Sequence, residues 1–299
     1  MKAIVLTYDK YHPLTKHMIL KYQELWPSNP FTFRVPYQKY PKHIKERFGD
    51  KVELIESPKG IKQTVLKLIK DLPDNEWVYW CIDDKYLINI KNEEANRFYK
   101  MVLSLNDPKI CGISFARSRK FLKTAHLRGL NKNLSQKGKD IFLERKDYQQ
   151  IWLHQFLRVK VLKHLFNQFP NENFIAKEMD YFKDNLKLPN NQKLLVSEKN
   201  YVIFGESTSR GMLTQNCVHS LNQLKLKPPK EFAISGKKII IGELDEQKNS
   251  SFFSSIFKKL QRSSLYCKLA RAILKITCPI PEELKRKWEE RLNRVIKFI

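Results

Sequence analysis

The sequence lacks the features of a disulfide-bonded, secreted or membrane-spanning protein. It has five cysteines, an odd number, and no two of them have the C-x-x-C spacing, so neither a disulfide framework nor a zinc knuckle is expected. No stretch approaches the roughly 20 apolar residues of a spanning helix. The first apolar run, residues 3–7, is too short for a signal peptide. A reducing, cytoplasmic location fits these absences best.

Acidic residues are far outnumbered by basic ones. The chain has 56 Lys and Arg against 31 Asp and Glu, a net charge of +25. Nucleic acid, an anionic membrane surface and a phosphate-bearing substrate would each explain this excess, and so would a Lys-rich surface without a partner. With 42% apolar and 29% charged residues, the composition is that of a folded soluble protein. Its 299 residues suit one large α/β domain, alone or with an appendage.

The apolar pattern predicts strands that alternate with helices. Strands are expected at residues 3–7, 31–35 and 52–55, and helices at 14–26 and 59–72. Residues 77–82 are six consecutive apolar residues, which is typical of a strand buried on both faces of a parallel sheet. The alternation predicts a doubly wound α/β fold with a mostly parallel central sheet flanked by helices. The later elements are expected to be a helix at 93–105, a strand at 110–116, a mobile loop at 117–145, a strand at 150–156, helices at 159–166 and 176–186, a strand at 194–204, a loop at 205–211 and a strand at 237–241.

Two adjacent carboxylates, Asp83 and Asp84, directly follow the buried strand at 77–82. In open α/β sheets, ligands bind beyond the carboxyl ends of the strands. A pair of carboxylates at that place suits a hard divalent cation that bridges a diphosphate. A simple strand-end turn, in which Asp bonds its own backbone, is the alternative for any isolated Asp-Asp pair. The return to apolar residues at Tyr86 favours the functional interpretation.

The segment Trp80-Cys81-Ile82-Asp83-Asp84-Lys85-Tyr86-Leu87 resembles the Asp-x-Asp region of GT-A glycosyltransferases, especially the bacterial enzymes of polysaccharide and lipooligosaccharide synthesis. This resemblance, which spans about residues 1–220, implies a GT-A fold. It also implies transfer of a sugar from a nucleotide-diphosphate sugar, such as a UDP-sugar, to a glycan or a lipid-linked acceptor. Mn²⁺ or Mg²⁺ would bind at Asp83 and Asp84. Lys85 stands where the usual motif has an acid or an aromatic, and we expect it to contact the diphosphate.

The resemblance also assigns the nucleotide-binding residues of the first strand. Thr7, Tyr8 and Asp9 follow that strand, where family members contact the nucleotide base. Tyr8 is expected to stack on the base and Asp9 to accept a hydrogen bond from it. A polar loop without any ligand is the alternative, because loops are polar by default.

Four later residues receive roles from the same resemblance. Glu178 is the expected catalytic base of an inverting reaction, taking the proton of the acceptor hydroxyl, and Asp180 is the second candidate. Both acids would also suit the first turn of a helix without any catalytic role. Arg210, in the loop 205–211, is expected to bind phosphate. His219 is the candidate third metal ligand, although a lone histidine is more often structural.

Two other functions compete with sugar transfer. A nucleic-acid-binding protein would explain the charge and the 12% of aromatic residues. However, the basic residues are spread along the chain, and no zinc finger, RRM signature or glycine-arginine tract appears, so no specific nucleic-acid partner is expected. The second alternative is a non-catalytic scaffold that keeps the transferase fold, which the unusual Lys85 makes worth testing.

A basic C-terminal region follows the predicted catalytic domain, residues 1–245. Residues 246–299 hold 13 Lys or Arg against 5 Asp or Glu. Their apolar residues recur at helical spacing, with basic residues between them, which predicts a basic amphipathic helical tail. Such helices lie in the plane of an anionic membrane surface. We therefore expect peripheral attachment to the cytoplasmic face of the inner membrane, and packing on the catalytic domain or in a homo-oligomer is the alternative.

Overall fold

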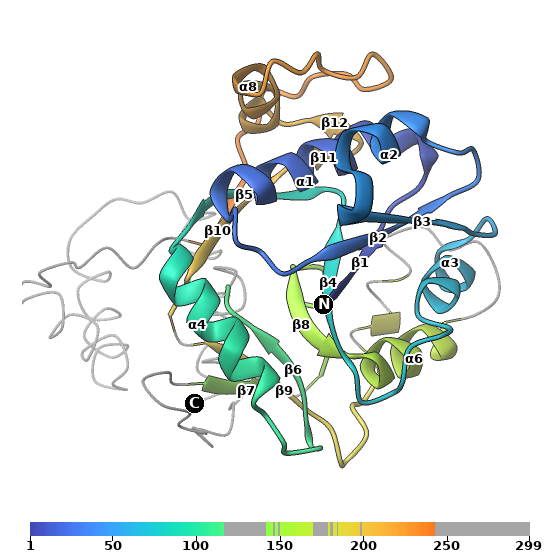
Figure 1. The fold of residues 1–299 in the computed structure, drawn as a ribbon, viewed down its shortest axis with the longest axis vertical. Helices are drawn as coiled ribbons and strands as arrows, with labels where there is room; N and C mark the ends of the chain where they lie inside the picture. Colours follow the sequence, from blue (N-terminus) through green and yellow to red (C-terminus); the bar gives the residue numbers. More distant parts are fainter. Residues whose placement is uncertain are drawn as a thin grey trace, which may run out of the picture. The chain divides into compact units, whose positions relative to one another are not determined.

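The computed structural model in Figure 1 describes residues 1–116, 142–145, 147–148, 150–169, 179, 182–183, 185–197 and 199–242. Its central sheet has eight strands, which are β1 (Lys2–Leu6), β2 (Thr32–Tyr37), β3 (Val52–Glu56), β4 (Trp77–Ile82), β6 (Ile110–Ser114), β7 (Phe142–Arg145), β8 (Gln155–Arg158) and β9 (Lys193–Ser197). Their order across the sheet is β3-β2-β1-β4-β8-β6-β9-β7. β1 therefore lies between β2 and β4, near the middle of the parallel half.

Most of the strands in this sheet run in the same direction. β3, β2, β1 and β4 are parallel to one another, and β6 is parallel to β9. β8 is antiparallel to both of its neighbours, β4 and β6, and β7 is antiparallel to β9. The predicted fold class, a mostly parallel α/β sheet, is confirmed.

Helices cover both faces of the sheet, as Figure 1 shows. One buried apolar cluster contains side chains of α1 (His12–Leu25), α2 (Lys42–Phe48) and α4 (Asn92–Leu103). The other contains side chains of α3 (Ile61–Leu68) and α6 (Val159–Gln168). Successive side chains of β4 alternate between the two clusters, with Tyr79 in the first and Trp80 in the second. β4 is thus buried on both faces, as its sequence predicts.

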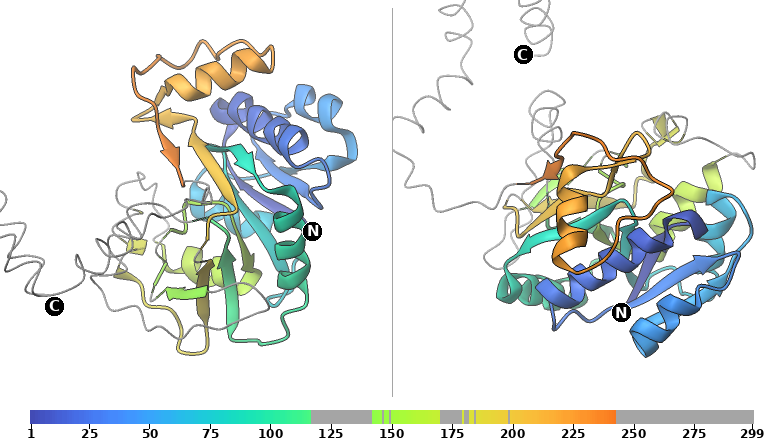
Figure 2. Two further views of the ribbon diagram at one scale, coloured as in Figure 1. Left: turned by 90° about the vertical axis from the view of Figure 1, so that its left-hand side faces the viewer. Right: turned by 90° about the horizontal axis from the view of Figure 1, so that it is seen from above.

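A smaller antiparallel sheet continues from the carboxyl end of β4. It has the order β13-β10-β5 and consists of β5 (Lys85–Ile90), β10 (Val202–Glu206) and β13 (Ile240–Ile241). The hairpin of β11 (Thr208–Ser209) and β12 (Met212–Leu213) follows β10 and leads into α8 (Gln215–Gln223). α8 lies beside α1 in both views of Figure 2, and His17 contacts Ser220 between them.

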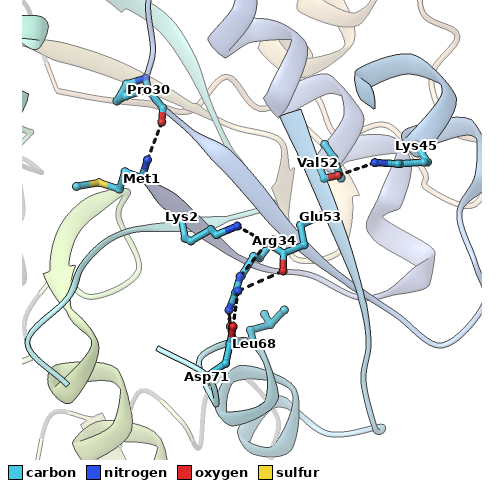
Figure 3. A network of polar contacts seen from close by, with 9 residues as sticks. All are labelled: Met1, Lys2, Pro30, Arg34, Lys45, Val52, Glu53, Leu68 and Asp71. Atoms are coloured by element: carbon cyan, nitrogen blue, oxygen red, sulfur yellow. Dashed lines mark hydrogen bonds and ion pairs between the residues drawn. The ribbon is translucent and has the colours of Figure 1, made fainter. Parts of the chain in front are cut away.

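A buried arginine fastens β2 to its neighbours (Figure 3). The Arg34 side chain is 3% exposed, and its Nη1 donates to the carbonyl oxygen of Leu68 (2.8 Å) and to Asp71 (2.7 Å). Its Nε and Nη2 donate to Glu53 on β3 (3.2 Å each). Lys2 Nζ on β1 reaches the same Glu53 carboxylate at 2.6 Å. The network joins three adjacent strands to the C-terminal end of α3 and the turn after it, because a planar guanidinium can serve several acceptors at once.

The structure corrects several of the predicted elements. The strand predicted at 194–204 is two strands, β9 and β10, which belong to different sheets. The polar residues between them, including Lys199 and Asn200, separate the two apolar runs. The strand predicted at 150–156 begins only at Gln155, because residues 150–153 form turns and a bend, with Gln150 in the left-handed region (φ 60°). Residues 142–145 form β7, within the stretch predicted to be a mobile loop.

Among the helices of the described residues, α2 and α8 have no counterpart among the predicted elements. Both are short, with 7 and 9 residues, so their apolar residues are too few to show a clear helical period. The predicted helix at 176–186 lies mostly outside the described residues, and the basic tail at 246–299 lies wholly outside them. Within the described part of the chain, no helix is long and apolar enough to cross a membrane.

Candidate functional site

The candidate site lies where the carboxyl ends of β1 and β4 meet. The two strands are parallel, and their register places Leu6 opposite Ile82. Asp83 N donates to the carbonyl oxygen of Leu6 (3.2 Å), which extends the pairing by one residue. Thr7 therefore comes next to Asp83. The chain turns at Asp83 and Asp84 and enters β5 at Lys85, so all of these side chains gather at one edge of the sheet.

Asp83 is the most enclosed carboxylate of the site, with 7% of the residue exposed. Burial raises its pKa well above the ordinary value, and the charge of Asp84 raises it further. A hydrogen bond from the Thr7 side chain partly opposes these effects. Thr15 Oγ1 of α1 donates to Thr7 Oγ1 (2.9 Å), which holds the threonine in place. Asp83 is thus a buried carboxylate that a nearby positive charge or hydrogen-bond donor would stabilise.

Lys85 forms the central ion pair of the site. Its Nζ lies 2.8 Å from Asp84 Oδ1 and 3.3 Å from Glu206 Oε1, and its side chain is 8% exposed. The antiparallel register of β5 and β10 places Glu206 directly opposite Lys85. Burial tends to lower the pKa of Lys85, but Asp84 and Glu206 outweigh burial and raise the pKa above its usual value. The lysine is therefore a fixed, protonated cation.

The carboxylates as placed do not fit the metal site that the sequence predicts. Asp84 presents one oxygen to the ammonium of Lys85, and Glu206 faces the same ammonium. Across the residues that the structure describes, no three His, Cys, Asp or Glu side chains are grouped so as to hold a metal ion. His219, the candidate third ligand, is an exposed residue of α8. The carboxylate oxygens that could bind a metal ion instead bind the ammonium group of Lys85.

Aromatic side chains adjoin the carboxylates. Tyr8 is 50% exposed, and its ring centroid lies 4.7 Å from that of Tyr11. The Tyr11 ring in turn meets Phe232 edge-on at 4.9 Å, and Lys10 Nζ lies 4.9 Å from the centre of the Phe232 ring. Burial raises the pKa of both tyrosines, and the charge of Asp83 adds to the rise in each. A partly exposed aromatic surface thus lies within electrostatic reach of Asp83.

Asp9 has a structural task in this region. Its two carboxylate oxygens accept hydrogen bonds from the backbone amides of Gln38 and Lys39, each at 2.9 Å. These amides belong to the loop that follows β2, so Asp9 ties the end of β1 to the end of β2. The expected contact of Asp9 with a base stays a prediction. The two backbone hydrogen bonds alone explain why an aspartate stands at this position.

Two hydrogen bonds to neighbouring segments hold the C-terminal end of β10 at the site. Ser207 N donates to the carbonyl oxygen of Asp84 (2.6 Å), and Thr214 Oγ1 donates to that of Glu206 (2.5 Å). Gly205 lies against Tyr86, and a Cβ added there would be 2.5 Å from the tyrosine ring. Only glycine fits such a close approach of β10 to β5.

The structure brings together some of the predicted residues and separates others. Thr7, Asp83, Asp84 and Lys85 lie together, with Tyr8 nearby. Arg210 lies at the exposed tip of the β11–β12 hairpin, with φ 52°, and His219 is exposed on α8. Their proposed roles remain predictions. Glu178 and Asp180, the predicted catalytic acids, lie outside the described residues.

Three residues of the site were missed in the sequence. Tyr11 follows Tyr8 by three positions in a short 3-10 helix, and this spacing was the available signal. Glu206 and Phe232 come from distant segments. Only the tertiary pairing of β5 with β10 reveals Glu206, and no local pattern marks Phe232 as a neighbour of Tyr11.

Solved structures similar to this chain include GT-A-type glycosyltransferases and sugar nucleotidyltransferases. The galactosyltransferase LgtC, in complex with donor and acceptor sugar analogues, is 12% identical with a TM-score of 0.35, over 96% of this chain and 100% of that one. UDP-glucose pyrophosphorylase complexed with UDP-glucose is 8% identical with a TM-score of 0.40, over 75% of this chain and 98% of that one.

TarS of S. aureus, residues 1–349, is 16% identical with a TM-score of 0.37, and the match covers 67% of this chain. This chain spans 59% of the length of that TarS chain. No family model matches the sequence, and no curated protein matches it. These similarities concern the fold alone. The function is therefore inferred from the residues of the site.

Proposed function

We propose that this protein is a glycosyltransferase that takes its sugar from a nucleotide-diphosphate sugar. The observation that carries the proposal is the Asp83-Asp84-Lys85 turn at the carboxyl end of β4, in which Asp83 and Lys85 are buried and Asp84 is partly exposed, beside the half-exposed Tyr8. In open α/β sheets this edge is where ligands bind. A charged turn and an aromatic surface side by side match the two halves of a nucleotide, its phosphates and its base.

Each group has a physical task in this proposal. Tyr8 offers a ring face on which a base stacks, a contact worth about 1–3 kcal/mol per base. The leaving nucleoside diphosphate develops negative charge, so a fixed positive charge at the end of β4 lowers the barrier to its departure. Lys85 is the cation held at that place by Asp84 and Glu206. The acceptor hydroxyl must lose its proton, the task predicted for Glu178 or Asp180.

The finer features of the reaction belong to the same proposal. Inversion at the anomeric carbon is supported by the resemblance of the acidic segment with Glu178 and Asp180 to the one that supplies the base in inverting family members. A UDP-sugar as donor and a glycan or lipid-linked acceptor are supported by the resemblance of residues 80–87 to the Asp-x-Asp region. A dependence on Mn²⁺ or Mg²⁺ stays a prediction of that resemblance. The placement of Lys85 leads to a different expectation, because its ammonium group already occupies Asp84.

The test is ligand-induced stabilisation of the full chain. ADP, CDP, GDP, dTDP, UDP and their common sugar conjugates are added singly, with and without manganese, and thermal unfolding is followed. A ligand at one hundred times its Kd stabilises the folded state by about 2.7 kcal/mol. We expect one nucleotide family to raise the Tm and Tyr8→Ala to weaken its binding, while Leu103→Ala, at an equally exposed position on α4, does not. If no nucleotide raises the Tm under either condition, the proposal is wrong.

Activity distinguishes an enzyme from a scaffold that retains the fold. Slow hydrolysis of the stabilising nucleotide sugar by the purified chain, measured as released nucleoside diphosphate, is the expected result. Stabilisation without any hydrolysis or transfer would favour the scaffold. Steep salt-dependent binding to DNA or RNA, without a nucleotide response, would favour the nucleic-acid alternative.

A further inference from the structure

We infer that Lys85 supplies the cation of the donor site, so that the diphosphate of the donor binds to its ammonium group without a divalent metal. The inference rests on the proposed function and deepens it. Its basis is the Lys85 ammonium, held 2.8 Å from Asp84 and 3.3 Å from Glu206 at the end of the central strand β4.

The main chain fixes this ammonium in position from two sides. Lys85 is the first residue of β5 and pairs with Glu206, the last residue of β10. Directly beside this pair, Ser207 N donates to the carbonyl oxygen of Asp84 (2.6 Å). Both carboxylate partners thus sit on backbone that is hydrogen-bonded across the two strands. A charge held in this way needs little reorganisation when a ligand arrives, which is the condition for effective electrostatic stabilisation.

The same contacts disfavour a divalent cation at Asp84. A metal ion on this carboxylate would lie within a few ångströms of the Lys85 ammonium, and in a partly buried site the two positive charges would repel each other strongly. The lysine cannot easily withdraw, because its side chain is 8% exposed and enclosed by the strand pair. A metal ion and the Lys85 ammonium would therefore compete for the Asp84 carboxylate. The lysine has the advantage because it is part of the chain and is always present there.

Lys85 keeps one donor for a ligand. An ammonium has three N–H donors, and the contacts with Asp84 and Glu206 use two of them. Asp84 and Glu206 have side chains that are 32% and 25% exposed, so the rim of the cluster is open to solvent. The cluster of two carboxylates and one ammonium retains one negative charge. The net charge of +25 on the whole chain supplies a field that still attracts an anionic ligand.

The experiment measures nucleotide binding to the full chain by titration calorimetry. Each of ADP, CDP, GDP, dTDP and UDP, together with the matching nucleoside, is titrated in excess EDTA and again in manganese chloride. We expect the diphosphate that binds to have the same Kd in both. The nucleoside has no phosphates, so its affinity measures the contribution of the base and the sugar. The ratio of the diphosphate affinity to the nucleoside affinity therefore gives the contribution of the phosphates.

Lys85→Met removes the charge while it keeps most of the side-chain volume. We expect it to weaken diphosphate binding by roughly 10–100-fold in EDTA, the worth of one charged hydrogen bond, and to leave nucleoside binding unchanged. Lys91→Met, an exposed lysine just beyond the far end of β5, is the matched control and should bind like the wild type. Lys85→Arg keeps the charge and should recover part of the diphosphate affinity.

The outcomes separate the inference from the proposed function. If wild-type binding disappears in EDTA and returns with manganese, Lys85 does not replace a metal and the inference is overturned, while the proposed function stands. If Lys85→Met binds the diphosphate as the wild type does, the inference also fails. If no diphosphate binds under either condition, the proposed function itself fails. Should Lys85→Met not fold, the EDTA comparison on the wild-type chain decides the question without any variant.

Discussion

His17 on α1 and Ser220 on α8 meet inside the protein, 203 positions apart in the sequence, with His17 Nε2 2.8 Å from Ser220 Oγ. The histidine has no exposed surface, and its ring also packs against Tyr86 at 4.6 Å between centroids. Burial lowers the pKa of His17 to about 3, and the charge of Lys21 acts in the same direction. A buried, neutral histidine therefore links the helix after β1 to the helix after β12.

This histidine predicts a loss of stability in acid. Between about pH 6.5 and 3 the unfolded chain binds a proton at His17 and the folded chain does not, so the free energy of unfolding falls as the pH falls. One such proton contributes about 1.4 kcal/mol per pH unit. His17→Gln keeps a donor near Ser220 and removes the proton, so the slope in urea unfolding should decrease by up to that amount. An unaltered slope in His17→Gln would contradict the assignment.

The close approach of β10 to Tyr86 predicts that Gly205→Ala destabilises the fold. The new Cβ would lie 2.5–2.7 Å from two ring carbons and the hydroxyl oxygen of Tyr86, and this tyrosine is 1% exposed with its hydroxyl held by Asn216 (2.7 Å). Overpacking of this kind costs about 1–3 kcal/mol. Urea unfolding should show a loss in that range. Gly236→Ala, where a Cβ meets nothing within 4 Å, is the control, and equal stability of the two variants would argue against the packing described.

Neutralising the two aspartates should have different effects. Asp84 holds Lys85 directly (2.8 Å), so Asp84→Asn removes a charged hydrogen bond and should reduce sugar transfer by roughly 10–100-fold. Asp83 is buried next to Thr7, and Asp83→Asn should mainly weaken donor binding, seen as a raised KM. Steady-state kinetics with the donor that stabilises the wild type separates the two effects. Full activity in both variants would remove the carboxylates from the mechanism.

Glu178 is predicted to be the base that deprotonates the acceptor. Glu178→Gln keeps the shape of the side chain and cannot accept the proton, so turnover should fall by about 10²–10⁴-fold while donor binding is retained. Single-turnover kinetics and calorimetry measure the two quantities. If Asp180→Asn alone behaves in this way, the base is Asp180. If neither variant is impaired, a retaining reaction becomes the better hypothesis.

The basic tail is predicted to hold the protein on anionic membranes. Six basic residues and no acid lie between residues 251 and 277, and each contributes about 1 kcal/mol near an anionic surface. In liposome flotation, the full chain should float with anionic vesicles and should stay at the bottom of the gradient with zwitterionic vesicles. A chain that ends at Asp245 should not float. Equal binding by both chains, or binding that ignores lipid charge, would rule out the anchor.

The sequence predicts those parts of the site that depend on local patterns. The six apolar residues of β4 mark a strand buried on both faces, and the edge at which Asp83 and Asp84 lie follows from that. The ion pair of Glu206 with Lys85 could not be predicted, because it forms only through the register of β10 against β5. The predicted strand at 194–204 hid this pairing, since an apolar stretch interrupted by a few polar residues does not reveal that its halves join different sheets.

The order of elements along the chain also has a consequence for synthesis. β3, β2, β1 and β4 lie within the first 82 residues, so this half of the sheet has its partners as soon as that stretch leaves the ribosome. β8, the other neighbour of β4, is made much later. Until then the apolar strand β4 is an edge strand, paired with β1 on one side and open to wrong pairing with other nascent chains on the other. During this interval, a chaperone that shields β4 is expected to raise the yield of folded protein.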